Sequence, residues 1–169
     1  MNIRRMTTKV ELPKHLSEYL IGKFADENNV VNLPCWSSLY FLFYELLQRR
    51  PADCPVDFGN TEIRLPSPRF AHKANGKPVE IFNYISRRGA ALLVKSINTM
   101  MKVEAHELFD ENKHVKGIDY IDSAYAFLEK YHIENLTVEA LLKDYQRWRE
   151  KIGRKKYNRK RAYIIKNVN

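Results

Sequence analysis

Several features are scarce in this sequence, and each shortage excludes a class of protein. There are only two cysteines, Cys35 and Cys54, which lie 19 positions apart without a C-x-x-C partner. Their spacing excludes a disulfide framework and a zinc ribbon and indicates reduced thiols. No apolar run approaches the roughly 18 residues of a membrane-spanning helix, and no hydrophobic signal core follows the charged Met1–Arg5. We therefore expect a cytoplasmic protein without a membrane partner.

Catalytic motifs are also missing. The sequence has no Walker loop, no G-x-G-x-x-G, no H-E-x-x-H and no nucleophile motif. We therefore expect no enzymatic activity, no cofactor and no small-molecule substrate. His106, Asp110 and His114 recur every four residues on one predicted helix face, but one helix rarely completes a metal site. We assign no metal site, and this row keeps a metal-dependent nuclease open as a second alternative.

The residues that are present predict a mainly α-helical protein. Hydrophobic residues make up 44% and charged residues 29%, as in a soluble domain. Apolar residues at helical spacing predict about five helices, over residues 13–25, 37–48, 86–112, 120–131 and 137–152. We expect residues 1–153 to form a single helical domain, with a helix-turn-helix-like unit at 119–152 and a basic tail at 154–169.

Two short segments alternate polar and apolar residues and predict a minor two-stranded sheet. They are Thr7–Leu12 and Thr61–Leu65. If the two strands pair, they share a buried face. That face consists of Val10, Leu12, Ile63 and Leu65.

The fourth predicted helix and the link after it carry their own signals. We expect Ile121, Ala124, Tyr125 and Leu128 to face inward. The link His132–Asn135 has no glycine, but histidine and asparagine tolerate the left-handed region better than most residues. Thr137 is a predicted N-cap for the last helix.

The positive charge is concentrated at one end of the chain. The net charge is +9, and residues 143–169 hold 11 basic and 2 acidic residues. The first 142 residues therefore hold 18 basic and 18 acidic residues, which cancel. An excess confined to one terminus indicates a polyanionic partner.

The last predicted helix separates an apolar face from a cationic one. Each residue of a helix is rotated by about 100° about the helix axis relative to the one before it. This rotation places four cations within about 80° of each other around the axis, namely Lys143, Arg147, Lys151 and Arg154. The opposite face is apolar and consists of Val138, Leu141, Leu142, Tyr145, Trp148 and Ile152. We expect the four cations to bind phosphates and Arg149 to reach a base edge. Beyond Gly153 we expect a flexible basic arm with Arg154, Lys155, Lys156, Arg159, Lys160 and Arg161.

Three stretches resemble known classes of protein. The pair of helices at 120–131 and 137–152 resembles a helix-turn-helix unit, although a plain αα-hairpin explains the same spacing. The start, Met6–Leu16, is similar to the strand and first helix of ribbon-helix-helix proteins, which leaves a homodimer open. The segments Asn83–Gly89, Glu107–His114 and Glu139–Arg149 resemble uncharacterised small proteins of bacterial phages and mobile elements.

Together these features favour a nucleic-acid-binding protein, with DNA preferred because the helix pair suits a major groove. The resemblance to phage proteins implies a regulator or accessory factor of a phage or mobile element. An adaptor whose basic end docks an acidic protein partner is the alternative.

Overall fold

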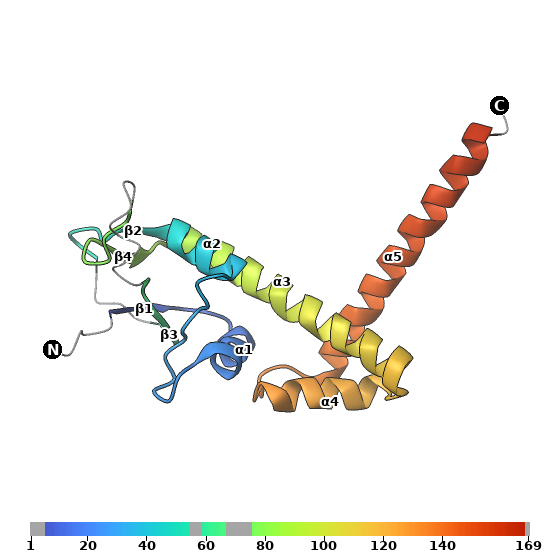
Figure 1. Ribbon diagram of the computed structural model, residues 1–169, viewed down its shortest axis with the longest axis horizontal. Coiled ribbons are helices and arrows are strands. Elements are labelled where there is room, and N and C mark those ends of the chain that lie inside the picture. The colour runs from blue at the N-terminus through green and yellow to red at the C-terminus, as the bar shows by residue number, and fades with distance from the viewer. Residues whose placement is uncertain (1–5, 55–58, 67–75, 168–169) are drawn as a thin grey trace. The chain divides into compact units, whose positions relative to one another are not determined.

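The computed structural model describes residues 6–54, 59–66 and 76–167, and for Arg154 and residues 156–167 it describes the backbone alone. Within these residues the fold is mainly helical, as predicted, with five α-helices and two small antiparallel sheets of two strands each (Figure 1). The chain forms two compact units. The first comprises residues 1–101 and 129–135, and the second comprises residues 102–128 and 136–169.

The predicted sheet is present in the first unit. Strand β1 (Thr7–Val10) pairs antiparallel with β3 (Thr61–Arg64), and Thr8 lies opposite Ile63. The expected buried face is confirmed, because Val10, Leu12, Ile63 and Leu65 are all buried. Helix α1 (Lys14–Phe24) packs on this sheet through a buried hydrogen bond of 2.7 Å from Thr61 Oγ1 to Ser17 Oγ.

A second sheet, which the sequence did not predict, follows helix α2 (Ser38–Leu46). Ser37 caps this helix by accepting a hydrogen bond from the Tyr40 N–H at 3.1 Å. The chain then enters β2 (Leu47–Arg49) directly, and β2 pairs antiparallel with β4 (Phe82–Ile85). Lys77 Nζ donates to the carbonyl groups of Tyr44, Glu45 and Leu47, which satisfies the open C-terminal end of α2.

The segment 131–135 belongs to the first unit and rests on α1. The Glu18 carboxylate accepts hydrogen bonds of 3.0 Å from the backbone N–H groups of Glu134 and Asn135. Gly22 contacts the backbone of Tyr131 so closely that a Cβ there would lie 2.4 Å from the Tyr131 carbonyl oxygen. His132 has a φ of 52°, so the left-handed geometry expected of the glycine-free link is confirmed.

Helix α3 (Arg87–Glu111) is the longest helix before the C-terminal one. Leu93, Ile97, Met101 and Ala105 form a buried stripe along it. The helix ends in a π-helical turn (Asn112–Lys116), and Gly117 follows with a φ of 71°. The left-handed Gly117 therefore ends this helical segment.

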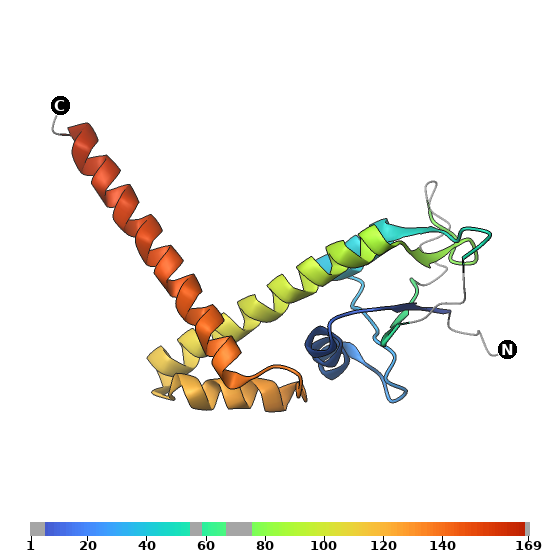
Figure 2. The same cartoon turned by 180° about the vertical axis from the view of Figure 1, so that it is seen from behind.

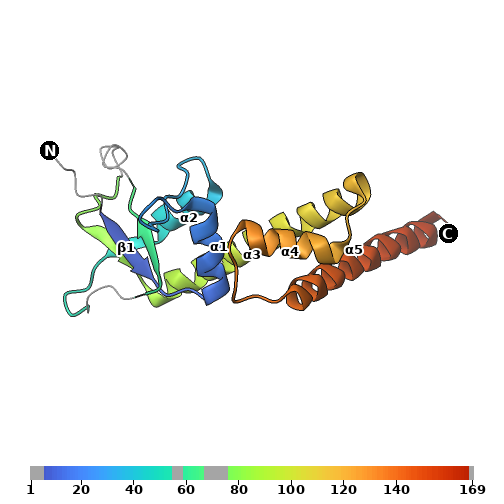
Figure 3. The ribbon, with the colours of Figure 1, turned by 90° about the horizontal axis from the view of Figure 1, so that it is seen from below.

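Helix α4 (Tyr120–Lys130) has a different buried face from the predicted one. It lies beside the C-terminal end of α3 (Figures 2 and 3). Ser123, Ala124 and Phe127 are buried, whereas Ile121 and Tyr125 are exposed, so the inward positions expected for those two were wrong. The buried face is the one that carries Ala124 and Phe127. Ser123 is accommodated on this face because Asn112 Nδ2 donates a buried hydrogen bond of 3.0 Å to Ser123 Oγ.

Helix α5 (Val138–Asn167) begins as predicted and continues beyond the predicted end. The Ala140 N–H donates to Thr137 Oγ1 at 3.2 Å, which confirms the N-cap. The backbone passes through Gly153 without a break, so the flexible arm expected from residue 154 was wrong. A single interior glycine costs a helix only about 1 kcal/mol, and the residues that follow include good helix formers. In the part of the chain that the structure describes, no helix is both long and apolar enough to cross a bilayer.

Candidate nucleic-acid interface

The apolar face of α5 is packed within the second unit. Leu141 and Tyr145 are buried, and Val138, Leu142, Trp148 and Ile152 are half-buried. The Tyr145 ring meets the Phe109 ring edge-on, with 5.2 Å between the two ring centroids. The centroid of the Trp148 ring lies 4.7 Å from that of the His106 ring. The predicted docking face of the helix is therefore confirmed. Trp148 is only half-buried and contributes less to this packing than a fully buried indole would.

Asp144 is the polar centre of the same contact. Its carboxylate accepts a hydrogen bond of 2.5 Å from Lys102 Nζ and lies 3.1 Å from Nε2 of the buried His106. Burial lowers the pKa of His106, and the neighbouring Asp144 opposes this effect only in part. Sequence reasoning missed this network, because the pattern of α5 does not reveal which residues of α3 face it.

A second polar contact fixes the aromatic side of α5. The Tyr145 hydroxyl donates a hydrogen bond to Asp110. Burial raises the pKa of the Tyr145 phenol, and the Asp110 carboxylate that accepts its proton raises it further. Asp110 of α3 and Asp144 of α5 therefore both contribute to the contact between these two helices.

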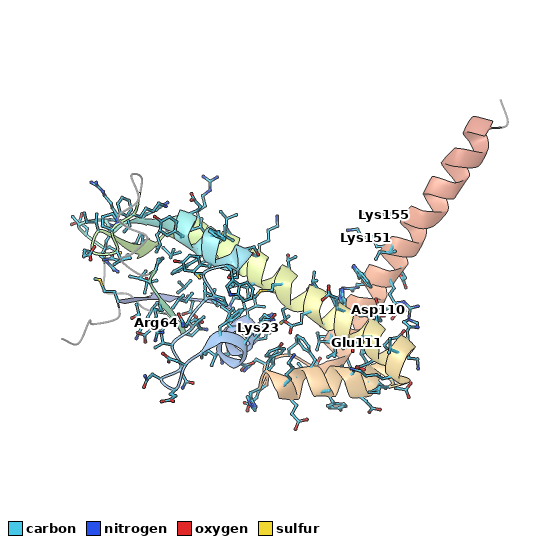
Figure 4. The ribbon with its side chains drawn as sticks, viewed as in Figure 1. Lys23, Arg64, Asp110, Glu111, Lys151 and Lys155 are labelled. Atoms are coloured by element: carbon cyan, nitrogen blue, oxygen red, sulfur yellow. The ribbon has the colours of Figure 1, made fainter. Side chains whose placement is uncertain are left out.

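The opposite face of α5 carries a row of exposed cations, Lys143, Arg147, Lys151 and Lys155. We call these four residues the α5 cation row. They recur every fourth residue, which corresponds to a rise of about 6 Å along the helix between neighbours. Figure 4 marks Lys151 and Lys155 on the helix. None of the four forms an ion pair within residues 6–54, 59–66 and 76–155.

Two carboxylates border the α5 cation row without joining it. Glu139 and Glu150 are exposed on the same helix, and Gln146 Nε2 donates to Glu150 Oε1 at 3.4 Å. At about 100° per residue, both glutamates fall within about 40° of Lys143. The row therefore has an acidic edge on the side of Lys143.

Arg149 differs from the other predicted contact residues. Its Nη1 donates to the Tyr120 hydroxyl at 3.1 Å, and its guanidinium lies 5.8 Å from the Tyr120 ring centroid and 5.7 Å from that of Tyr145. These contacts hold the side chain over the aromatic cluster. Its expected role at a base edge stays a prediction.

The rest of the predicted site lies beyond the described side chains. The backbone of this stretch is helical. The predicted residues whose side chains fall outside the description are Arg154, Lys156, Arg159, Lys160 and Arg161.

The three residues that could have held a metal are not gathered into one site. His106 is engaged by Asp144, Asp110 accepts from Tyr145, and His114 is exposed in the π-helical turn. The helical spacing that would align them ends with α3 at Glu111. Among the residues with described side chains, no group of three or more histidine, cysteine or acidic residues could hold a metal ion.

Comparison of the chain with protein-family models, with curated proteins and with solved structures found no match. The resemblances to helix-turn-helix, ribbon-helix-helix and phage proteins therefore stay predictions.

Proposed function

We propose that this protein binds nucleic acid, DNA in particular, and that the α5 cation row contacts the phosphates. The observation that carries the proposal is the separation of charge on one helix. Lys143, Arg147 and Lys151 are exposed without ion-pair partners in the described part of the chain, while Asp144 is directed to the packed side. Cations that the protein does not neutralise itself are available to a polyanion.

The regular spacing supports a backbone contact more than a base contact. Cations that repeat along one helix face can bind successive phosphates, and such contacts carry no sequence information. The proposal therefore concerns affinity and its dependence on salt. We also propose a cytoplasmic location and a non-enzymatic role for the protein.

The experiment is a salt titration of binding to a labelled DNA duplex. Each phosphate contact contributes about −0.9 to the slope of log affinity against log salt. We expect the variant Lys143→Gln/Arg147→Gln/Lys151→Gln to bind at least about tenfold more weakly at low salt and to have a slope smaller by about 3.

The matched control removes three exposed lysines of the first unit, Lys9→Gln/Lys14→Gln/Lys95→Gln. It changes the net charge by the same amount. Equal losses in the two variants would show that only net charge matters and would contradict the proposed site. Wild-type protein that does not bind DNA at all would contradict the function.

The alternative of a protein adaptor is favoured by one observation, the exposure of two aromatic side chains in the first unit. Trp36 is 81% exposed and Phe41 is 58% exposed. Exposed aromatic side chains are typical anchors of protein interfaces. An adaptor of this kind shows no DNA binding in the salt titration, and it loses affinity for its protein partner when Trp36 is replaced by serine.

A further inference from the structure

The second sheet carries a pair of arginines at each of its two ends, and the two pairs are far apart in the sequence. Arg49 ends β2, Arg50 follows it, and Arg87 and Arg88 open α3 two residues after the end of β4. The strands pair with Arg49 opposite Phe82 and Leu47 opposite Ile85. One pair of arginines therefore lies at each end of a short two-stranded ribbon.

Two of these arginines are oriented by the ribbon itself. The Arg49 guanidinium lies 5.5 Å from the ring centroid of Phe82, and that of Arg50 lies 5.7 Å from Tyr84. Arg50 also donates from Nε to Asn83 Oδ1 at 3.3 Å. A guanidinium stacked on a ring keeps its planar set of donors in a defined orientation, which suits bidentate binding of phosphate.

The other two arginines occupy a place that the fold alone does not favour. Arg87 and Arg88 are exposed in the first turn of α3, which contains no acidic residue. The positive end of a helix dipole repels cations, so this placement costs stability in the free protein. Arg49, Arg87 and Arg88 have no ion-pair partner within the described residues.

The neighbouring charges do not cancel this surface. Glu45 and Glu80 are exposed in adjacent segments, and neither forms an ion pair in the part of the chain that the structure describes. Lys77 adds a further positive charge, although its ammonium group is bound to the carbonyl groups at the end of α2. The local excess is therefore positive.

We infer that Arg49, Arg50, Arg87 and Arg88 form a second phosphate-binding surface for nucleic acid, on the first unit. We call it the arginine ribbon. The inference rests on the proposed function for its ligand, but it uses different residues in a different unit from the α5 cation row. Its partner is the phosphate backbone, because the surface offers oriented guanidinium groups.

The test measures duplex binding over a range of salt concentrations with the variant Arg49→Gln/Arg87→Gln/Arg88→Gln. Arg50 is left in place because its hydrogen bonds to Asn83 belong to the ribbon. We expect the affinity for the duplex to be at least about tenfold lower at low salt. If each arginine contacts one phosphate, the slope of log affinity against log salt should be less steep by about 3. The variant Arg49→Lys/Arg87→Lys/Arg88→Lys keeps the charge and should keep most of the slope.

The outcomes separate this inference from the proposed function. If the arginine variant matches the Lys9/Lys14/Lys95 control while the α5 variant loses binding, the arginine ribbon is overturned and the function stands. If the arginine variant loses binding while the α5 variant matches that control, the α5 site is overturned and the ribbon stands. Thermal melting of each variant at the wild-type temperature or above shows that lost binding does not come from unfolding, and a variant that melts lower is assayed at a temperature well below its own melting point.

Discussion

His106 Nε2 lies 3.1 Å from Asp144 Oδ2, and this contact joins α3 and α5 within the second unit. Asp144 directly follows Lys143, the first member of the α5 cation row. Its carboxylate is nevertheless directed to His106 and to Lys102, whose ammonium lies 2.5 Å away. The acidic residue therefore stabilises the packing of the helix and leaves the charge of the row intact.

Replacing Asp144 by asparagine should destabilise the protein. The change removes the charged partner of Lys102 and His106, and we expect the free energy of unfolding to fall by about 1–2 kcal/mol. Urea unfolding measures the loss. The control is Glu107→Gln, an exposed residue of α3, which should stay within about 0.5 kcal/mol of wild type. Equal effects of the two changes would contradict a stabilising role for Asp144.

Stability should depend on pH through His106. Burial holds its pKa below the ordinary value of 6.5, so the unfolded chain binds this proton more tightly than the folded protein. The unfolded state then binds more protons, and stability rises with pH in this range. The contribution is fully present above pH 6.5 and declines as the pH falls through 6.5 toward the lowered pKa.

The measurement is the free energy of unfolding at a series of pH values on both sides of 6.5. We expect wild type to lose stability on acidification and His106→Gln to lose less over the same interval. Wild-type stability that rises on acidification would show that the charged histidine is favoured by Asp144 and that burial is not the dominant effect.

The Tyr145 hydroxyl offers a cleaner test of the packed face, because phenylalanine keeps the ring. Tyr145→Phe removes the hydrogen bond to Asp110 and should lower the free energy of unfolding by about 1 kcal/mol. Tyr125→Phe is the matched control, since Tyr125 is exposed on α4. The prediction fails if thermal unfolding shifts equally in both variants.

Two glycines should respond to alanine in opposite directions. A Cβ on Gly22 would lie 2.4 Å from a backbone oxygen of Tyr131, so Gly22→Ala should cost about 1–3 kcal/mol or more. A Cβ on Gly153 meets nothing within 4 Å in the described residues, and Gly153→Ala should stabilise α5 by about 0.5–1 kcal/mol. Circular dichroism and thermal melting measure both changes, and a stabilised Gly22→Ala would contradict the close approach.

Local patterns in the sequence predicted the parts of the fold that one segment determines. The alternation around Val10 and Ile63 predicted both strands and their shared buried face, because a strand with one buried face has a period of two. Three members of the cation row were predicted for a similar reason, whereas Lys155 was assigned to the flexible arm. The helical period alone places Lys143, Arg147 and Lys151 on one side.

Features that depend on a partner segment were missed or misread. The buried hydrogen bond between Asn112 and Ser123 places a polar residue on the buried face of α4, which hydrophobicity alone does not predict. The sheet of β2 and β4 escaped prediction because strands of three and four residues are too short to show a period. The Asp144 network required knowing which face of α3 meets α5.

The helical backbone of α5 continues for 14 residues after Gly153, as far as Asn167. A flexible arm of the same composition would lose conformational entropy on meeting a ligand, at a cost of about 1–2 kcal/mol for each backbone residue that becomes fixed. A segment that is already wound into a helix avoids most of this loss. Any ligand that follows α5 beyond the packed region therefore meets a preorganised backbone, and little coupled folding accompanies its association.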